Sequence, residues 1–258
     1  MNTIPAYLII GTPGSGRRGV IWDVIQKALG DDDFCGVFIS ENEAPAQSDK
    51  RIASAQNAGI IRYRDADDAI EKIAALDKEK FSQIFFFADA SRNLADDIED
   101  FKRIVDAGDA RLARIWGVLD CGLLAARRED VQPYADALSH FSDCLLLSRR
   151  DGLQNREVAE IKSAYEKQCK PHMFEYVDKD FRVKRPIEMM IEEARRISMV
   201  FDPVDPVDDL DIDEDNLPEE PFSLERKPDP YLERLPNGLR KKPIPELSKI
   251  AASFRAQK

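Results

Sequence analysis

The residues best suited to chemistry stand near the start of the chain, where an apolar run meets an amphipathic segment. The run Leu8-Ile9-Ile10 leads into a glycine-rich stretch, and a segment with helical periodicity follows and ends near Leu29. A strand, a tight turn and a helix in this order form the context in which backbone N–H groups cradle a phosphate. The residues predicted to contact the ligand are Gly11, Gly14, Ser15, Gly16, Arg17 and Arg18.

The turn keeps the spacing of the phosphate-binding motif G-x-x-x-x-G-K-[ST] but changes its chemistry. Arg17 stands in place of the lysine, and Arg18 in place of the hydroxyl that holds Mg²⁺. Two planar guanidinium groups reproduce neither the compact charge nor the metal ligand, so hydrolysis should be weak or lost and Mg²⁺ poorly held. Anion binding by backbone N–H groups needs no particular side chain. The loop is therefore predicted to hold a nucleotide or another phosphate; the alternative is a purely structural turn.

Polar residues follow two further predicted strands. Asn42 and Glu43 come after the strand expected over 34–40, and Asp89 and Ser91 come after the one over 82–88. Ligands of open α/β sheets bind at the carboxyl ends of the strands. Asn42 and Glu43 are thus predicted nucleotide contacts, and Asp89, which could hold a magnesium-bound water, is the predicted catalytic residue; the alternative is that these acids are merely solvated. An Arg17 paired with Glu43 or Asp89 would indicate an internally neutralised pocket.

Other site chemistries find little support. His140 and His172 are far apart, and the four cysteines occur singly, so no zinc or other metal site is predicted. No G-x-S-x-G is present, and no cysteine has an obvious histidine partner. The glycine spacing also differs from the G-x-G-x-x-G of dinucleotide-binding folds, which disfavours an oxidoreductase.

The elements that must position these residues alternate regularly along the chain. Further strands are predicted over 59–61, 114–120, 143–148 and 172–177, and further helices over 66–76, 94–107, 128–139, 154–168 and 186–200. Apolar runs such as Ile84-Phe85-Phe86-Phe87 are typical of strands that are buried on both faces. The prediction is an α/β fold with a doubly wound, mainly parallel sheet.

Charge divides the chain into three parts. Residues 202–220 carry ten acidic and no basic side chains, and 221–258 carry nine basic and four acidic ones, which leaves −6 of the net −11 for 1–201. We predict an α/β domain over 1–201, a disordered acidic linker over 202–221, and a basic, proline-rich tail over 222–258. The tail should contain an Asn237-Gly238 turn and a short C-terminal helix.

The tail is also the expected partner-binding element. The helix would carry Leu247, Ile250, Ala251 and Phe254 on one face. The net charge of the tail is positive, whereas that of the α/β domain over 1–201 is negative. We expect it to bind this chain's own domain or another protein, including a second copy of the chain. The acidic body lacks the basic surface of a nucleic-acid binder, no apolar run reaches the length of a membrane span, and the isolated cysteines favour the cytoplasm.

Taken in order, these landmarks resemble the CobW-type P-loop GTPases, which are linked to metal delivery and cobalamin synthesis. Gly11, Gly14 and Gly16 match the phosphate loop, and Asn42-Glu43 matches an N-E strand end. The three metal-binding cysteines of the family would fall at Ile60, Arg62 and Tyr63, so all are replaced. Asp89 and Ser91 match E-x-S, with a shorter acid.

Within Ser148-Arg149-Arg150-Asp151 only the last residue of the family's N-K-x-D motif remains. The resemblance implies that Asp151 binds guanine; an N-cap or turn role before helix 154–168 is the alternative. It further implies a divergent GTP-binding protein with weak or lost hydrolysis. The alternative function is a pseudo-GTPase that acts as an interaction or scaffold module.

Overall fold

The computed structural model describes residues 3–202 and 228–256. The chain divides into two compact units, one formed by Met1–Ile197 with Ile244–Lys258 and the other by Ser198–Pro243. The predicted acidic linker lies outside the described residues, apart from Asp202. Within the second unit, the predicted turn is present: Gly238 has φ +82°, and Arg234 and Arg240 form an antiparallel bridge around it.

The first unit is built on a seven-stranded sheet in which every pairing is parallel. Its order is β3-β2-β4-β1-β5-β6-β7. The strands span β1 Ile4–Gly11, β2 Cys35–Ser40, β3 Ala58–Tyr63, β4 Gln83–Phe87, β5 Ala110–Asp120, β6 Cys144–Ser148 and β7 Met173–Tyr176. The predicted doubly wound α/β fold is confirmed.

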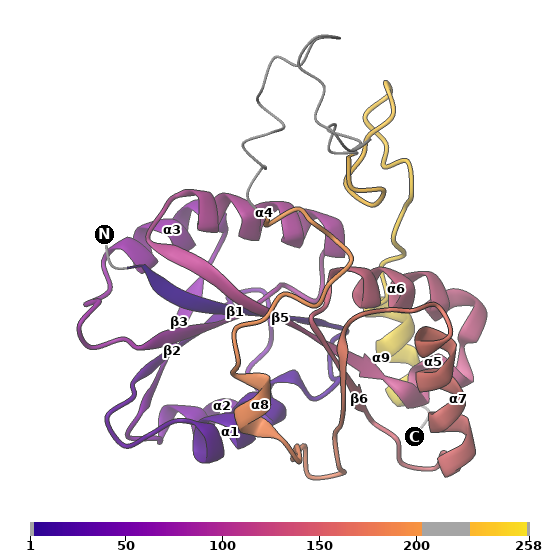
Figure 1. Cartoon of the computed structure of the whole chain (residues 1–258), viewed down its shortest axis with the longest axis horizontal. Helices are drawn as coiled ribbons and strands as arrows, with labels where there is room; N and C mark the ends of the chain where they lie inside the picture. Colours follow the sequence, from indigo (N-terminus) through magenta and orange to yellow (C-terminus); the bar gives the residue numbers. More distant parts are fainter. Residues whose placement is uncertain (1–2, 203–227, 257–258) are drawn as a thin grey trace, which may run out of the picture. The chain divides into compact units, whose positions relative to one another are not determined.

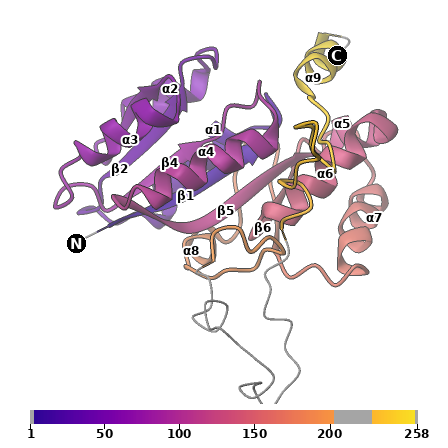
Figure 2. The same ribbon diagram turned by 90° about the horizontal axis from the view of Figure 1, so that it is seen from above.

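Helices cover both faces of this sheet (Figure 1). They span α1 Arg17–Ala28, α2 Gln47–Ala53, α3 Ala66–Ala74, α4 Leu94–Asp106, α5 Cys121–Ala126, α6 Arg128–Phe141, α7 Asn155–Glu166, α8 Pro186–Met189 and α9 Ser248–Ala256. The helices α1, α2 and α8 lie on one face, whereas α3, α4 and α6 lie on the other (Figures 1 and 2). The inner strands β2, β4 and β6 are buried along their whole length, as the apolar sequence of β4 predicted, whereas the edge strands β3 and β7 are partly exposed.

Two short helices, α2 and α5, were not predicted, and the helix predicted over 186–200 is wrong. Only the four residues of α8 are helical there. Beyond it, Asp143 accepts hydrogen bonds from the backbone N–H of Arg195 (2.7 Å) and from Arg196 Nη1 (3.2 Å), and Ile197 N–H donates to the His140 carbonyl. These tertiary bonds hold the segment extended and override its helical periodicity.

The topology places the loop after β1 at a special point of the sheet. β1 lies between β4 and β5, and the chain builds the sheet outward from it in both directions. This reversal of strand order is the point at which open α/β sheets bind ligands, beyond the carboxyl ends of the strands.

Candidate functional site

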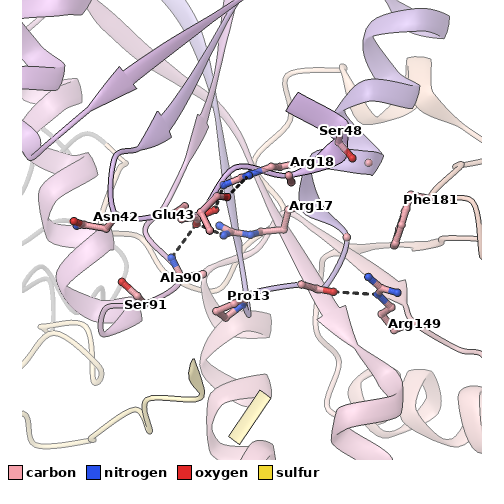
Figure 3. A pocket seen from close by; sticks show the side chains of 15 residues that line it. Pro13, Arg17, Arg18, Asn42, Glu43, Ser48, Ala90, Ser91, Arg149 and Phe181 are labelled. Atoms are coloured by element: carbon pink, nitrogen blue, oxygen red, sulfur yellow. Dashed lines mark hydrogen bonds and ion pairs between the residues drawn. The ribbon is translucent and has the colours of Figure 1, made fainter. Parts of the chain in front are cut away.

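A cavity of about 380 Å³ opens beside the loop that joins β1 to α1. Figure 3 shows how side chains from several loops converge on it. Its lining consists of Pro13, Gly14, Gly16, Arg17, Arg18, Gly19, Asn42, Glu43, Ala44, Ala46, Ser48, Ala90, Ser91, Arg149 and Phe181. The structure therefore brings together predicted residues from the ends of three strands, β1, β2 and β4.

The loop has a tightly defined backbone. Ser15 N–H donates to the Thr12 carbonyl (3.1 Å), and Gly14 and Gly16 have φ of +70° and +98°. Gly16 is the N-cap of α1, and its left-handed conformation turns the chain into the helix. Gly11 ends β1 behind the loop, and the Ser15 side chain is fully buried and does not line the cavity.

The two arginines that follow the loop are engaged by the protein itself. Arg17 Nη1 donates to the Ala88 carbonyl (2.7 Å), and Nη2 pairs with Glu43. Arg18 Nη2 donates to Glu43 (2.7 Å), and its Nη1 donates to Asp49 (2.9 Å). Both side chains are at least nine-tenths buried. The arrangement is the internal neutralisation described above for an Arg17–Glu43 pair.

Glu43 is the centre of this cluster. It receives both guanidinium groups and also the Ala90 N–H (3.2 Å), so one carboxylate connects α1 to the loops after β2 and β4. Burial raises the pKa of Glu43, but the Arg17 charge, the Ala90 N–H and the Arg18 charge outweigh burial and hold the pKa below its usual value. The carboxylate is thus ionised at neutral pH and offsets the arginines.

Asp89 lies deeper, at the tip of β4. Its Oδ2 accepts from Ser40 Oγ (3.0 Å) and Asn42 Nδ2 (2.9 Å), and its Oδ1 accepts from Ser91 N–H (3.0 Å) and Oγ (2.6 Å). Burial raises the pKa of Asp89, yet these hydrogen bonds outweigh it and leave the pKa lowered. Four donors occupy the acceptor sites of this carboxylate, which ties the ends of β2 and β4 together.

Arg149 and Phe181 also line the cavity, and neither is among the predicted site residues. The Arg149 guanidinium stacks on the Phe181 ring, 4.6 Å from its centroid, and Nε donates to the Gly14 carbonyl (3.0 Å). Both residues have a left-handed backbone, with φ of +53° and +63°. Bulky residues rarely adopt this conformation, and it concentrates at functional sites. Asp151, by contrast, is exposed and is not part of the lining.

Phe181 also explains a glycine inside a helix. A Cβ on Gly19 would lie 2.7 Å from the Cβ, Cγ and Cδ2 atoms of Phe181, and one on Gly16 would lie 2.2 Å from Cε1. The ring therefore rests directly on the first turn of α1. The tight turn that holds it, in which Phe181 N–H donates to the Asp178 carbonyl, carries no sequence pattern that indicates this placement.

Metal-ligating groups are not gathered in the described residues. Within 3–202 and 228–256, no three His, Cys, Asp or Glu side chains converge on a point that could hold a metal ion. Burial raises the pKa of the Cys35, Cys121 and Cys144 thiols to about 12, and burial together with Lys170 lowers that of His172 to about 4.

Among the described residues, no helix is long and apolar enough to cross a membrane.

Comparisons with known proteins give partial similarity to some solved structures. No protein-family model and no curated protein matches the chain. Among solved structures, the Zn(II)-bound YjiA GTPase from E. coli is 14% identical, with a TM-score of 0.46 over 76% of this chain and 67% of that one. The signal recognition particle receptor FtsY from Elizabethkingia anophelis, in complex with GDP, is 13% identical, with a TM-score of 0.49 over 75% and 65%. FtsY from Thermotoga maritima is 13% identical, with a TM-score of 0.49 over 75% and 71%.

Proposed function

We propose that this protein binds a nucleotide through its phosphates, GTP or GDP in the first place, at the loop between β1 and α1, and that it does not hydrolyse it efficiently. The observation that carries the proposal is the cavity at the N-terminus of α1, lined by the loop itself. The first N–H groups of a helix have no intrahelical acceptor, and the helix dipole adds positive potential there. Both favour an anion at this place.

The engagement of Arg17 and Arg18 argues against turnover. Phosphoryl transfer needs a cation between the phosphates and a bound Mg²⁺. Here the residue at the lysine position donates to Glu43 and to a β4-end carbonyl, and the residue at the hydroxyl position is held by Glu43 and Asp49. Asp89 is saturated by four donors, which supports a positioning role for it.

GTP is proposed over other nucleotides because of the resemblance to CobW-type GTPases, in which the residue matching Asp151 binds guanine. Asp151 is exposed and so is accessible to a base. Asn42 and Ser91 are further polar residues in the lining of the cavity. A metal-delivery role is not part of the proposal, since the cysteines of that family are replaced here.

The test is thermal unfolding with GTP, GDP, ATP and inorganic pyrophosphate, each with Mg²⁺ and with EDTA. A ligand at roughly a hundred times its Kd adds about 2.7 kcal/mol, which corresponds to about 5–10 °C in Tm for a unit of this size. We expect such a shift with GTP and GDP, of equal size with EDTA, and no release of phosphate from GTP over hours.

A pair of substitutions on α2 localises the effect. Ser48 lines the cavity, so Ser48→Trp should fill it and abolish the shift, while Ala53→Trp, at an exposed position on the same helix, should leave it intact. The absence of any shift with every nucleotide at millimolar concentration would refute nucleotide binding. It would favour the second candidate, an interaction module, which is supported by the ion pairs that Glu43 and Asp49 form with the two arginines.

A further inference from the structure

The strongest feature without an assigned role is a pair of arginines, Arg149 and Arg255, beside the loop between β1 and α1. Arg149 reaches it from the end of β6, with Nε on the Gly14 carbonyl and its planar face on Phe181. Within the described residues, no acceptor takes a hydrogen bond from its two Nη groups. The Arg149 guanidinium is thus held through its Nε and by stacking on Phe181. Its two Nη groups remain available to a ligand in the cavity that Arg149 lines.

Arg255 reaches the same loop from the C-terminal helix α9. A Cβ on Gly14 would lie 2.3 Å from Arg255 Nη1, so the guanidinium rests against the glycine. Leu247, just before α9, and Ala251 on α9 are buried, and Asn93 Nδ2 donates to the carbonyl of Ile244 (3.0 Å) in the segment that leads into the helix. These contacts fix the segment 244–256 beside the loop, and Gly14 is the residue that admits the arginine.

Charge is not balanced at this place. Arg255 Nη2 pairs with Asp120 Oδ2 (3.1 Å), while Asp120 Oδ1 caps α5 through the Leu123 N–H (2.9 Å). Among the described residues, Asp120 is the one carboxylate that pairs with either guanidinium, and it also caps α5. Burial and the Arg255 charge both lower the pKa of Arg149, against smaller opposite effects of Asp120 and Asp151. Two cations held near each other raise the energy of the free protein, and a polyanion would relieve this repulsion. Arg17 and Arg18 offer no such excess, because Glu43 and Asp49 offset them.

We propose that Arg149 and Arg255, and not Arg17 and Arg18, are the side chains that receive the phosphate charge, so that helix α9 completes the ligand site. The ligand class is a diphosphate or triphosphate group, bound by the loop N–H groups and the two guanidiniums. This inference rests on the proposed function, and it adds the C-terminal segment to the binding site. Binding of the phosphates and docking of α9 are then coupled, each strengthening the other.

Calorimetric titration with inorganic pyrophosphate and with GDP, in EDTA at low salt, tests the assignment. We expect Arg149→Gln and Arg255→Gln each to raise the Kd at least tenfold. Lys249→Gln, which removes an exposed charge from the same helix, should change it less than twofold. Lysine at 149 or 255 keeps the charge and should lose less affinity than glutamine. Melting curves of the free variants establish that each is folded.

A further variant separates direct binding from general support of the fold. Asp120→Asn removes the carboxylate that competes for Arg255 but can still cap α5, so it should lower the Kd at least threefold. A residue with a purely structural role would give weaker binding instead. Backbone amides over 244–256 should also exchange more slowly with deuterium when pyrophosphate is bound.

The outcomes are distinct. If the unaltered protein binds neither ligand, the proposed function fails and this inference fails with it. If it binds and both glutamine variants bind like Lys249→Gln, the inference alone is overturned. If Arg255→Gln binds more tightly than the unaltered protein, Arg255 occupies the phosphate position and blocks it, which also overturns the inference.

Discussion

Replacing Glu43 by glutamine should destabilise the protein far more than its position in a loop indicates. The carboxylate joins Arg17, Arg18 and the Ala90 N–H, and its side chain is 14% exposed. Removing one partner of a buried ion pair costs about 3–5 kcal/mol, because a charge is left uncompensated. Glutamine keeps one acceptor oxygen and Asp49 still holds Arg18, so we expect a loss of about 3 kcal/mol. The Tm should fall by roughly 6–12 °C.

The assay is urea unfolding followed by tryptophan fluorescence, since Trp116 is fully buried in the sheet. The midpoint should fall at an unchanged m-value, because the folded core stays the same. Glu41→Gln is the matched control: it removes the same charge two residues earlier, at an exposed position. Adding Arg17→Met to Glu43→Gln should restore part of the loss, since it removes the unpaired cation.

Equal stability of Glu43→Gln and Glu41→Gln, within about 0.5 kcal/mol, would refute this reasoning, since that is the usual scale of a surface substitution. A further loss on adding Arg17→Met would also contradict it. In that case the Arg17 bonds to backbone carbonyls, and not the charge pair, would hold the cluster.

Three further predictions concern the same unit. The free energy of unfolding should fall as the pH drops below about 4.3. Glu43 has a lower pKa in the folded chain than in the unfolded chain, so the unfolded chain then binds more protons. Urea titrations from pH 6 to 3 should show a shallower fall for Glu43→Gln than for the unaltered protein, and parallel curves would contradict this prediction. Gly19→Ala should cost about 1–3 kcal/mol despite the better helix propensity of alanine, because its Cβ would meet Phe181, and Phe181→Ala in the same chain should remove most of that cost in thermal melts. Asp143→Asn should cost about 3 kcal/mol and expose residues 190–197 to trypsin; cleavage there at the rate of the unaltered protein would show that the buried Asp143–Arg196 pair does not hold this segment.

The sequence was informative about the fold wherever burial was uniform. The runs at 34–40, 82–88 and 143–148 are mostly apolar, since both faces of a parallel sheet are covered, and each contains a strand. The helix α2 was missed because only Asp49 and Ile52 of its seven residues are buried, too few for a periodic pattern. The segment 186–200 has helical periodicity, but it is held extended by bonds to Asp143, a residue more than forty positions earlier.

The sequence could likewise place some residues of the candidate site and not others. Asn42, Glu43, Asp89 and the loop could be placed because each follows a recognisable strand, and parallel strands end at one edge. The partners of Arg17 and Arg18 could not be predicted, and the sequence analysis could say only what an Arg17–Glu43 or Arg17–Asp89 pair would mean. Pairing between separate loops leaves no local sequence pattern. Phe181 could not be placed, because an aromatic residue in an irregular turn carries no periodicity.

The left-handed backbone at Arg149 and Phe181 has a consequence for how such a site can change during evolution. Each residue is held in a conformation that costs of order 1–3 kcal/mol, so the surrounding structure must outweigh that energy. Glycine would remove the strain at either position, but it would also delete the stacked pair of guanidinium and ring. A drift towards easier backbone geometry is therefore opposed wherever the pair is needed. Retention of large side chains at these two positions in related chains would be a mark of selection on the cavity itself, independent of the glycine-rich loop.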